Sequence, residues 1–273
     1  MFSQLDKPLI MGILNITPDS FSDGGKYTSI NDALQQVERM LAEGVDIIDI
    51  GGESTRPGSD SVAAVEQQQR VIPVITAIRQ QLKSTVLISI DTTSSAVAKA
   101  ALTAGANIIN DVSAGQDDEA ILALAAQTEV PIILMHSQGT PKTMQDNPYY
   151  DDVVQEVINA LNKRINAALN AGIKKENIAL DPGIGFGKRR QDNLDLLAHL
   201  DALVALGFPV LLGTSRKRFM GTLCDVTEPS ELVTATAVTT ALGVMAGVRI
   251  FRVHDVKENR QAADVAWAIK QSR

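Results

Sequence analysis

Four polar residues of this chain carry the functional groups that a protein needs to hold a planar nitrogen heterocycle. Each lies at or just beyond the end of a separate short apolar segment, and the four are Asp91, Asn110, Asp181 and Lys217. Two carboxylates and an amide can read the donor edge of a ring with an N–C–N unit, and a lysine ammonium can meet the ring carbonyl or a ring nitrogen. Together these residue types predict a binding site for a small heterocycle.

A second pair of residues suits an anion. Arg252 and His254 alternate with Val253, and side chains two positions apart on a strand point the same way. Two cationic donors on one face can bind a phosphate or a pyrophosphate. Alternatively, Arg252 pairs with a carboxylate such as Asp255 or Asp49.

Ordinary structural roles are the alternative for the other residues. Asp91 precedes Thr-Thr-Ser-Ser and could cap a helix, and Asn110 could be a turn residue. His136 could be a core histidine with satisfied hydrogen bonds. Caps and turns do not explain why two acids, an amide and a lysine should follow successive apolar segments, so we favour one shared ligand site.

The elements that must position these residues alternate between two patterns. Short runs rich in Ile, Val and Leu predict strands at 9–15, 45–52, 85–91, 107–113, 131–137, 178–183, 209–215 and 249–255. Apolar residues that return every three or four positions predict helices at 30–43, 62–83, 94–104, 118–128, 151–171, 193–206, 229–246 and 257–271. Glycines such as Gly105 and Gly247 stand where a left-handed cap would end a helix.

Eight continuous apolar strands separated by helices indicate a parallel sheet that is buried on both faces. Their number favours one α/β domain over residues 1–273, a (β/α)8 TIM barrel with its active site at the carboxyl ends of the strands. An open dinucleotide-binding sheet is disfavoured because no GxGxxG turn follows the first strand. Loops 16–25 and 51–58 are rich in Gly, Pro and small polar residues, which is typical of covers over a site.

The composition excludes several classes of protein. A net charge of −7 over 273 residues disfavours nucleic acid and anionic membranes as partners. No apolar stretch approaches the roughly 20 residues that span a bilayer, and the start lacks the pattern of a signal peptide, so we expect a cytoplasmic protein. The single cysteine, Cys224, lies apart from the polar residues above, which disfavours a thiol mechanism.

Six ordered segments resemble the signature segments of the dihydropteroate synthases. They are MGILNITPDSFSDGG at 11–25, DIGGESTRPG at 49–58, INDVS at 109–113, LDPGIGFGK at 180–188, GTSRK at 213–217 and RVHDV at 252–256. The resemblance spans nearly the whole chain, and a pterin ring presents the donor edge described above. It implies an enzyme of folate biosynthesis, a sulfonamide target, that transfers the dihydropterin methyl group from 6-hydroxymethyl-7,8-dihydropterin pyrophosphate to the amine of p-aminobenzoate.

Roles for individual residues follow from the resemblance. The pterin would be bound by Asp91, Asn110, Asp181 and Lys217, and the pyrophosphate by Asn15, Arg56, Arg252 and His254. Asn15 would also lie near a magnesium ion that keeps most of its waters. The p-aminobenzoate pocket would be built by Thr55, Arg56, Pro57, Phe186 and Arg218, with the two loops closing over it.

The chemistry implied is a displacement of pyrophosphate. Magnesium and the cations would stabilise the leaving group, and the amine would attack an electrophilic pterin methylene. Asp23 is our candidate for a negative group that stabilises the cationic methylene, and Lys217 is the second candidate catalytic residue. Arg218 stands where other members of the family have Ser, so recognition of the p-aminobenzoate carboxylate is the point at which this chain departs from the pattern.

Three rival hypotheses about function remain open, and the sequence also predicts how the chain assembles. The rivals are a methyltransferase that passes a methyl group from a folate to a corrinoid protein, an aldolase with a Schiff base on Lys217, and a pterin carrier without catalysis. The helix at 229–246 has small and apolar residues all round, so we expect a two-fold homodimer that uses this surface.

Overall fold

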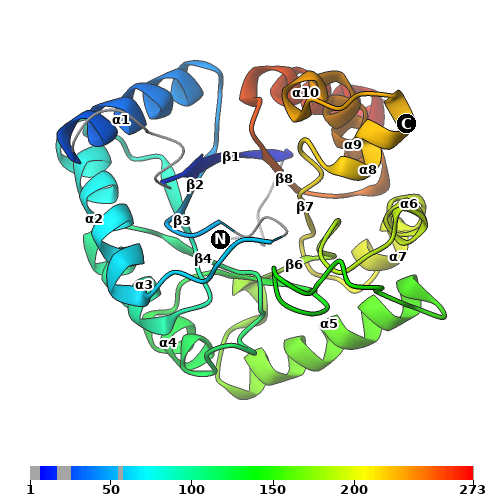
Figure 1. The fold of residues 1–273 in the computed structure, drawn as a ribbon, viewed down its shortest axis with the longest axis horizontal. Helices are drawn as coiled ribbons and strands as arrows, with labels where there is room; N and C mark the ends of the chain where they lie inside the picture. Colours follow the sequence, from blue (N-terminus) through cyan, green and yellow to red (C-terminus); the bar gives the residue numbers. More distant parts are fainter. Residues whose placement is uncertain (1–6, 17–25, 55–57, 273) are drawn as a thin grey trace.

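The fold is described from a computed structural model, which covers residues 7–16, 26–54 and 58–272. Eight parallel strands form one sheet in the order β6-β5-β4-β3-β2-β1-β8-β7. The strands are β1 Leu9–Asn15, β2 Ile47–Gly51, β3 Leu87–Asp91, β4 Ile108–Asp111, β5 Ile132–Met135, β6 Ile178–Asp181, β7 Leu211–Leu212 and β8 Ile250–Val253. Figure 1 shows them at the centre of a ring of helices, which confirms the expected (β/α)8 barrel.

The barrel closes between β6 and β7 through a short contact. Leu180 and Val210 form a parallel bridge, and the Leu180 N–H donates to the Pro209 carbonyl at 2.9 Å. The expected strand at 209–215 is reduced to Leu211–Leu212 because Pro209 has no N–H for a ladder and the chain leaves the sheet at Gly213.

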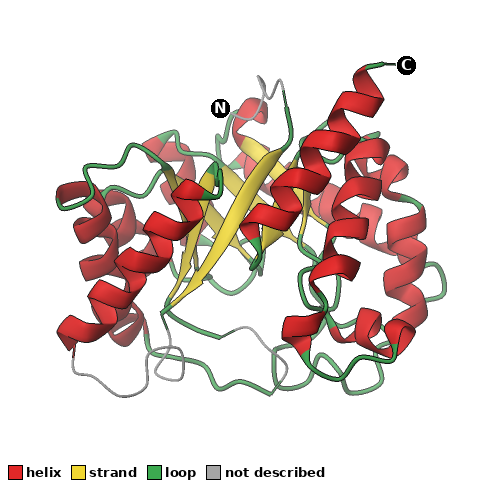
Figure 2. Ribbon diagram, turned by 90° about the horizontal axis from the view of Figure 1, so that it is seen from above, coloured by secondary structure: helices red, strands yellow, loops and turns green. Residues whose placement is uncertain are grey.

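Helices connect the strands on the outside of the barrel, as Figure 2 shows. They are α1 Lys26–Ala42, α2 Ala64–Gln80, α3 Ser95–Ala104, α4 Ala120–Thr128, α5 Val153–Asn170, α6 Arg190–Ala198, α7 Leu200–Val204, α8 Arg218–Cys224, α9 Val233–Ala246 and α10 Val256–Gln271, and the described residues also form 3-10 turns at Lys175–Asn177 and Pro229–Glu231. Gly105 and Gly247 adopt the predicted left-handed caps, with φ of 115° and 109°. In the described part of the chain, no helix is long and apolar enough to cross a membrane.

The structure differs from the predicted helices in two places. The helix expected at 193–206 is two helices, because the backbone of His199 leaves helical geometry at φ −119° and ψ 34°. No element was predicted between 215 and 229, yet α8 begins at Arg218, directly after Lys217. Helix α8 is too short to show a clear apolar period, so the sequence pattern gave no sign of it.

The barrel interior is filled by one apolar cluster that draws on most of the strands. Its buried members are Met11, Ile47, Ile108, Ile133, Ala179, Leu211 and Ile250. A larger core lies between the strands and the surrounding helices. Because the inner cluster occupies the lower part of the barrel, only the ends of the strands are left to build a site.

Gly243 sets how closely α9 approaches the barrel. A Cβ atom at this position would lie 2.7 Å from Cε1 of Phe251 and 3.1 Å from Cδ2 of Leu212. The ring of Phe251 is itself 1% exposed and has no free space to move into. A glycine in the middle of this helix is therefore explained by packing.

Gly243→Ala is expected to lower the free energy of unfolding by about 1–3 kcal/mol, because the added methyl group overpacks the α9 interface. At an unconstrained helix position the same change would stabilise the protein by about 1 kcal/mol. The sign of the change in urea-induced unfolding decides between the two. A stabilised variant would contradict the close packing.

Candidate active site

Four strands repeat one local pattern on the inner face of the barrel. In each, a residue of the inner apolar cluster is followed two positions later by a polar residue that is buried or, for Arg252, partly buried, and the pairs are Ile47 and Asp49, Ile108 and Asn110, Ala179 and Asp181, and Ile250 and Arg252. Because strand side chains alternate between faces, the second member of each pair also points inward, one level nearer the mouth. The polar members of these pairs, Asp49, Asn110, Asp181 and Arg252, form a layer above the apolar interior, which we call the polar floor of the mouth.

The guanidinium of Arg252 lies at the centre of this floor. Its Nε donates to Oδ2 of Asp49 at 2.6 Å, and its Nη2 donates to Oδ2 of Asp91 at 2.7 Å. The Asp49 side chain is fully buried and that of Asp91 is 6% exposed. Asn110 completes the network by donating from Nδ2 to both oxygens of Asp49, at 3.4 and 3.3 Å. Strands β2, β3, β4 and β8 are thus joined by one charged network.

Burial and charge act against each other in this network. Burial raises the pKa of the Asp91 carboxyl well above its usual value; the Arg252 guanidinium lowers it, and the Asp49 carboxylate raises it further. Burial alone would lower the pKa of Arg252, but the two carboxylates more than offset this and raise it. Arg252 therefore stays cationic, whereas the pKa of Asp91 is raised by burial.

The ends of β1, β2 and β3 lie side by side, with Asn15 paired to Gly51 and Gly51 to Asp91. A Cβ atom at Gly51 would lie 3.5 Å from Oδ1 of Asn15 and 3.7 Å from Oδ2 of Asp91. Because Gly51 has no side chain, open space remains between the amide oxygen of Asn15 and the carboxylate oxygen of Asp91.

Asp181 and Lys217 approach the same mouth from the other side of the barrel. Oδ1 of Asp181 accepts from the Gly183 N–H at 2.7 Å, and burial raises the pKa of this carboxyl to about 6 despite that bond and the nearby cations. A Cβ atom at Gly213 would lie 3.9 Å from both Asp181 Oδ2 and Arg252 Cβ, so little separates these two residues.

Cationic side chains follow β7 and β8. Nζ of Lys217 lies 4.3 Å from the centre of the Phe186 ring, a cation–π contact. Nδ1 of His254 lies 2.9 Å from the Ser215 hydroxyl, which also accepts from the His254 N–H at 3.1 Å. Arg218 is exposed at the first position of α8.

The structure decides between several of the alternatives left by the sequence. Asp91 is not the cap of α3, because Ser94 occupies that position. Arg252 does pair with Asp49, as the structural alternative expected, and with Asp91 as well. Asp255 pairs instead with Arg216, between Nη2 and Oδ1 at 2.6 Å.

His136 is partly exposed rather than a core residue, and its Nδ1 lies 2.9 Å from Nζ of Lys188. Four predicted site residues, Asp23, Thr55, Arg56 and Pro57, lie outside the described residues. The remaining predicted residues come from the carboxyl ends of the strands or the loops that follow them, except Arg218, which is the first residue of α8.

Sequence reasoning gave no site role to Asp49 and Lys188. Asp49 follows Ile47 by two positions on a strand that the sequence did predict, so the alternation that paired Arg252 with His254 also identifies Asp49 as inward-facing. Lys188 carried no such signal, because its burial depends on the path of the loop after β6.

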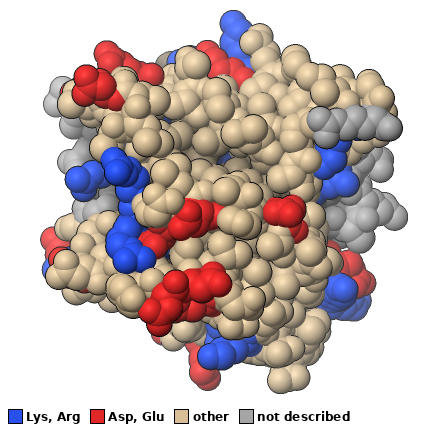
Figure 3. Space-filling model, turned by 90° about the vertical axis from the view of Figure 1, so that its right-hand side faces the viewer, with Lys and Arg blue, Asp and Glu red and all other residues tan. Residues whose placement is uncertain are grey.

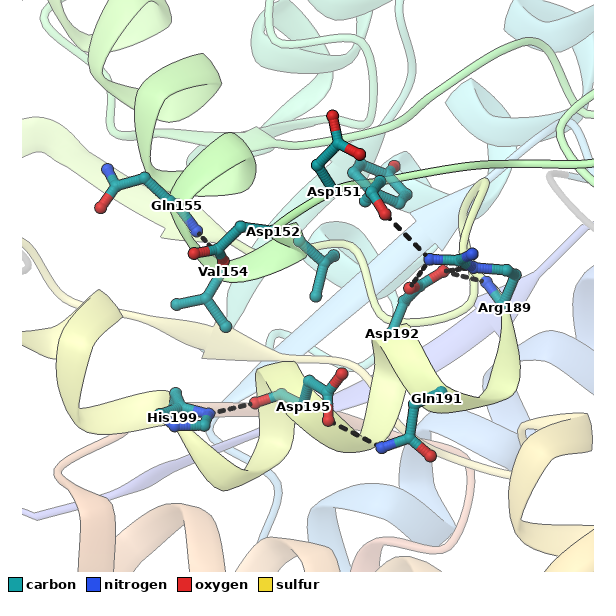
Figure 4. Close-up of a pocket in the computed structure, with 11 residues that line it drawn as sticks. Asp151, Asp152, Val154, Gln155, Arg189, Gln191, Asp192, Asp195 and His199 are labelled. Carbon is teal, nitrogen blue, oxygen red and sulfur yellow. Dashed lines mark hydrogen bonds and ion pairs between the residues drawn. The ribbon is translucent and has the colours of Figure 1, made fainter.

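A separate groove of about 620 Å³ lies between the start of α5 and α6, and Figure 4 shows its lining. Acidic side chains gather along it, namely Asp151, Asp152, Asp192 and Asp195. Arg189 bonds to Asp192 at 2.7 Å, which neutralises part of this charge. No residue lining this groove, as far as the described residues go, is a predicted site residue, so the barrel mouth is the candidate active site.

Comparisons with known proteins identify the family of this barrel. Residues 11–254 match the family of pterin binding enzymes, which defines the class of this barrel. A dihydropteroate synthase of Streptococcus pyogenes is 50% identical over 257 residues, which are 94% of this chain and 93% of the relative. That of Synechocystis is 45% identical over 98% of this chain and 92% of the relative. The solved dihydropteroate synthase of Xanthomonas albilineans with 4-aminobenzoic acid has a TM-score of 0.90 and 45% identity, and covers 97% of this chain and 94% of that one.

The chain belongs to the dihydropteroate synthases, transferases of folate biosynthesis. This membership replaces the rival methyltransferase, aldolase and carrier hypotheses.

Arg252→Met is expected to lower the free energy of unfolding by about 3–5 kcal/mol near pH 8, because it leaves buried carboxylates without their cation. The pKa of Asp91 is raised on folding, so its ionisation opposes folding, and the loss should shrink as pH falls through that pKa toward about pH 5. Urea-induced unfolding at the two pH values measures this.

The control is Arg39→Met, which removes an exposed partner of Glu43 and should change stability little at either pH. An equal loss at both pH values in Arg252→Met would show that lost packing, rather than an uncompensated Asp91 carboxylate, explains the effect.

Proposed function

We propose that the barrel mouth holds 6-hydroxymethyl-7,8-dihydropterin pyrophosphate, transfers its dihydropterin methyl group to the amine of p-aminobenzoate and releases pyrophosphate. The observation that carries this proposal is the bond between Arg252 and Asp91 at 2.7 Å. It links a carboxylate suited to the ring with a cation suited to the diphosphate, as one substrate with both parts requires.

The ring is proposed to lie among Asp91, Asn110, Asp181 and Lys217. With its pKa raised only to about 6, Asp181 is mostly ionised at neutral pH and can accept from ring N–H donors. Because the Asn110 amide nitrogen donates to Asp49, its carbonyl oxygen is the atom that would accept from the ring.

The diphosphate is proposed to lie toward Arg252, His254 and Asn15, with Arg56 from the loop after β2. Ser215 orients the imidazole of His254 through Nδ1, which directs Nε2 away from the hydroxyl. Two donors of Arg252 already bond to carboxylates, so this guanidinium reaches the diphosphate from a fixed position. Fixed donors stabilise a leaving anion without reorganising during the reaction.

Magnesium is the proposed metal, with Asn15 as its protein ligand. The side-chain oxygen of Asn15 is a hard donor beside the Asp91 carboxylate, which suits this ion. No cluster of three or more acidic, histidine or cysteine ligands is found in the described part of the chain, so substrate phosphates and water would complete the coordination. When bound, the ion would neutralise charge on the departing pyrophosphate.

The p-aminobenzoate is proposed to bind between Phe186 and the loop residues Thr55, Arg56 and Pro57, with Arg218 near its carboxylate. The Xanthomonas albilineans relative, solved with 4-aminobenzoic acid, supports this choice of substrate. The amine would form a bond to the pterin methylene as the bond to the pyrophosphate oxygen breaks, and the amine then loses a proton. Lys217 and Asp23 remain the proposed catalytic residues, and the cytoplasm remains the predicted location.

A homodimer is proposed to form through α9 and α10. Thr236, Thr240, Gly243 and Val244 are the buried residues of α9, whereas Val238 and Leu242 are 54% and 62% exposed. Val265 and Ile269 on the adjacent α10 are 61% and 53% exposed. Much of the upper surface in Figure 3 is free of charged side chains. Covering such apolar residues with a second copy is favourable.

Mixing the protein with the dihydropterin pyrophosphate, p-aminobenzoate and magnesium is expected to release pyrophosphate, which a coupled phosphate assay follows. Removing magnesium with EDTA should slow release strongly, because charge on the leaving group is no longer neutralised. Asp181→Asn is expected to reduce kcat/KM by about tenfold or more, since a charged hydrogen bond to the ring is lost. A wild-type protein that releases no pyrophosphate from active substrates would refute the proposal.

Leu242→Asp is expected to convert a dimer into a monomer in sedimentation velocity at micromolar concentration, because it places a charge in an apolar interface. The matched control is Leu169→Asp on α5, whose side chain is also exposed and lies outside the proposed interface. A monomeric wild-type protein would contradict the proposed assembly.

A further inference from the structure

The loop between β6 and α6 is pressed against its neighbour through glycines. Gly183, Gly185 and Gly187 have φ of 64°, 82° and 62°, which side chains other than that of glycine rarely allow. A Cβ atom at Gly183 would overlap the His136 carbonyl oxygen, and one at Gly187 would overlap that of Gln138. The loop backbone therefore lies directly on the backbone that follows β5.

Lys188 at the end of this loop turns its side chain back beneath it. Nζ is the donor to the carbonyls of Gly183 at 2.9 Å and Phe186 at 3.1 Å, and it lies 2.9 Å from Nδ1 of His136. The residue is 3% exposed. An ammonium group has three protons, and these contacts supply one acceptor for each.

Burial and the groups around Lys188 shift its pKa in opposite directions. Burial lowers the pKa of Lys188 to about 7, and the Asp181 carboxylate opposes that shift. Burial, together with the adjacent Lys188, lowers the pKa of His136 to about 3, so the imidazole is neutral and Nδ1 can accept. Hydrogen bonds that Nζ donates to carbonyl and imidazole acceptors favour the ammonium form.

Two further side chains hold carbonyls of the same loop from outside. The Tyr150 hydroxyl donates to the Gly187 carbonyl at 2.8 Å, and Gln145 Nε2 donates to that of Gly185 at 3.0 Å. Tyr150 is 5% exposed, and its ring lies 6.2 Å from that of His136. The loop is thus fixed by side chains from the segment after β5 as well as by Lys188.

The held segment carries the Phe186 ring that contacts Lys217. A Cβ atom at Gly185 would lie 3.2 Å from Cδ of Lys217, so the lysine chain also rests on this loop. Asp181 lies on β6 itself, although its Oδ1 also accepts from the Gly183 N–H of this loop. The carbonyls held by Tyr150 and Gln145 are those of Gly187 and Gly185, which flank Phe186, so loss of the Tyr150 bond is expected to displace Phe186 more than Asp181.

We propose that Lys188 and Tyr150 are positioning residues that hold Phe186 in place for p-aminobenzoate, acting through backbone carbonyls rather than by touching the substrate. The proposal rests on the proposed function and adds the elements that shape its second substrate pocket. Neither residue takes part in the chemical step.

Tyr150→Phe is the sharpest test, because it keeps the buried ring and removes only the hydroxyl. The KM for p-aminobenzoate is expected to rise about fivefold, the effect of one lost hydrogen bond, while the KM for the pterin pyrophosphate stays within about twofold. Calorimetric titration with p-aminobenzoate should show the same loss of affinity. The matched control is Tyr149→Phe, whose hydroxyl bonds to Asp151 at the surface and whose loss should leave both KM values unchanged.

Lys188→Met is expected to raise the KM for p-aminobenzoate more than Tyr150→Phe does, because two loop carbonyls lose their donor. Should this variant fail to fold by circular dichroism, Tyr150→Phe decides the matter. An equal rise in both KM values, or an unchanged affinity for p-aminobenzoate in Tyr150→Phe, would overturn the proposal. Absence of turnover in the wild type would instead count against the proposed function, while calorimetry would still test the role of Tyr150.

Discussion

The partly buried guanidinium of Arg252 determines how the mouth of this barrel is built. The Arg252 guanidinium, inside a closed ring of strands, lies 2.6 Å from Asp49 and 2.7 Å from Asp91. Desolvating such groups costs several kcal/mol for each ion, so the arrangement persists only where bonds replace the lost water. Asn110 contributes one of those bonds. The constraint ties together strands that are far apart in the sequence, because each must supply its residue at the same height in the barrel.

Under the proposed function, the same network explains how one mouth would hold a substrate with two unlike parts. A pterin ring needs acceptors for its N–H donors, and a diphosphate needs cations, and such groups would neutralise each other if they were free to move. Here the strand positions keep them apart except at the bonds between Arg252 and the two carboxylates. Asp181 stands beside Gly213, where the absence of a side chain lets it come near Arg252 without an ion pair. The ion pairs of Arg252 with Asp49 and Asp91 therefore also hold these three side chains in position.

Much of this arrangement could be predicted from the sequence, and the reasons for the failures are physical. The strands were found because burial on both faces makes each an unbroken apolar run, and Asp91, Asn110 and Asp181 stood out where those runs end. Asp49 was predicted only as a possible partner of Arg252 and was given no site role, because it lies inside a run, where only the alternation of side chains distinguishes it. Lys188 could not be found at all, since its burial depends on three left-handed glycines and on contacts with His136. Local sequence patterns predict the strands, but they do not predict the path of a loop.

The need to bind substrate limits how stable this barrel can become. Replacing a buried ion network by apolar residues of similar volume is often neutral or stabilising. Below the mouth, the inward faces of the same strands carry apolar residues instead of an ion network. These residues are Ile47, Ile108, Ala179 and Ile250. One level higher the polar residues remain, although an apolar layer would avoid their desolvation. Stability alone does not account for them, whereas recognition of a charged, hydrogen-bonding ligand does, and the change from apolar to polar between successive inner positions marks where the core ends and the site begins.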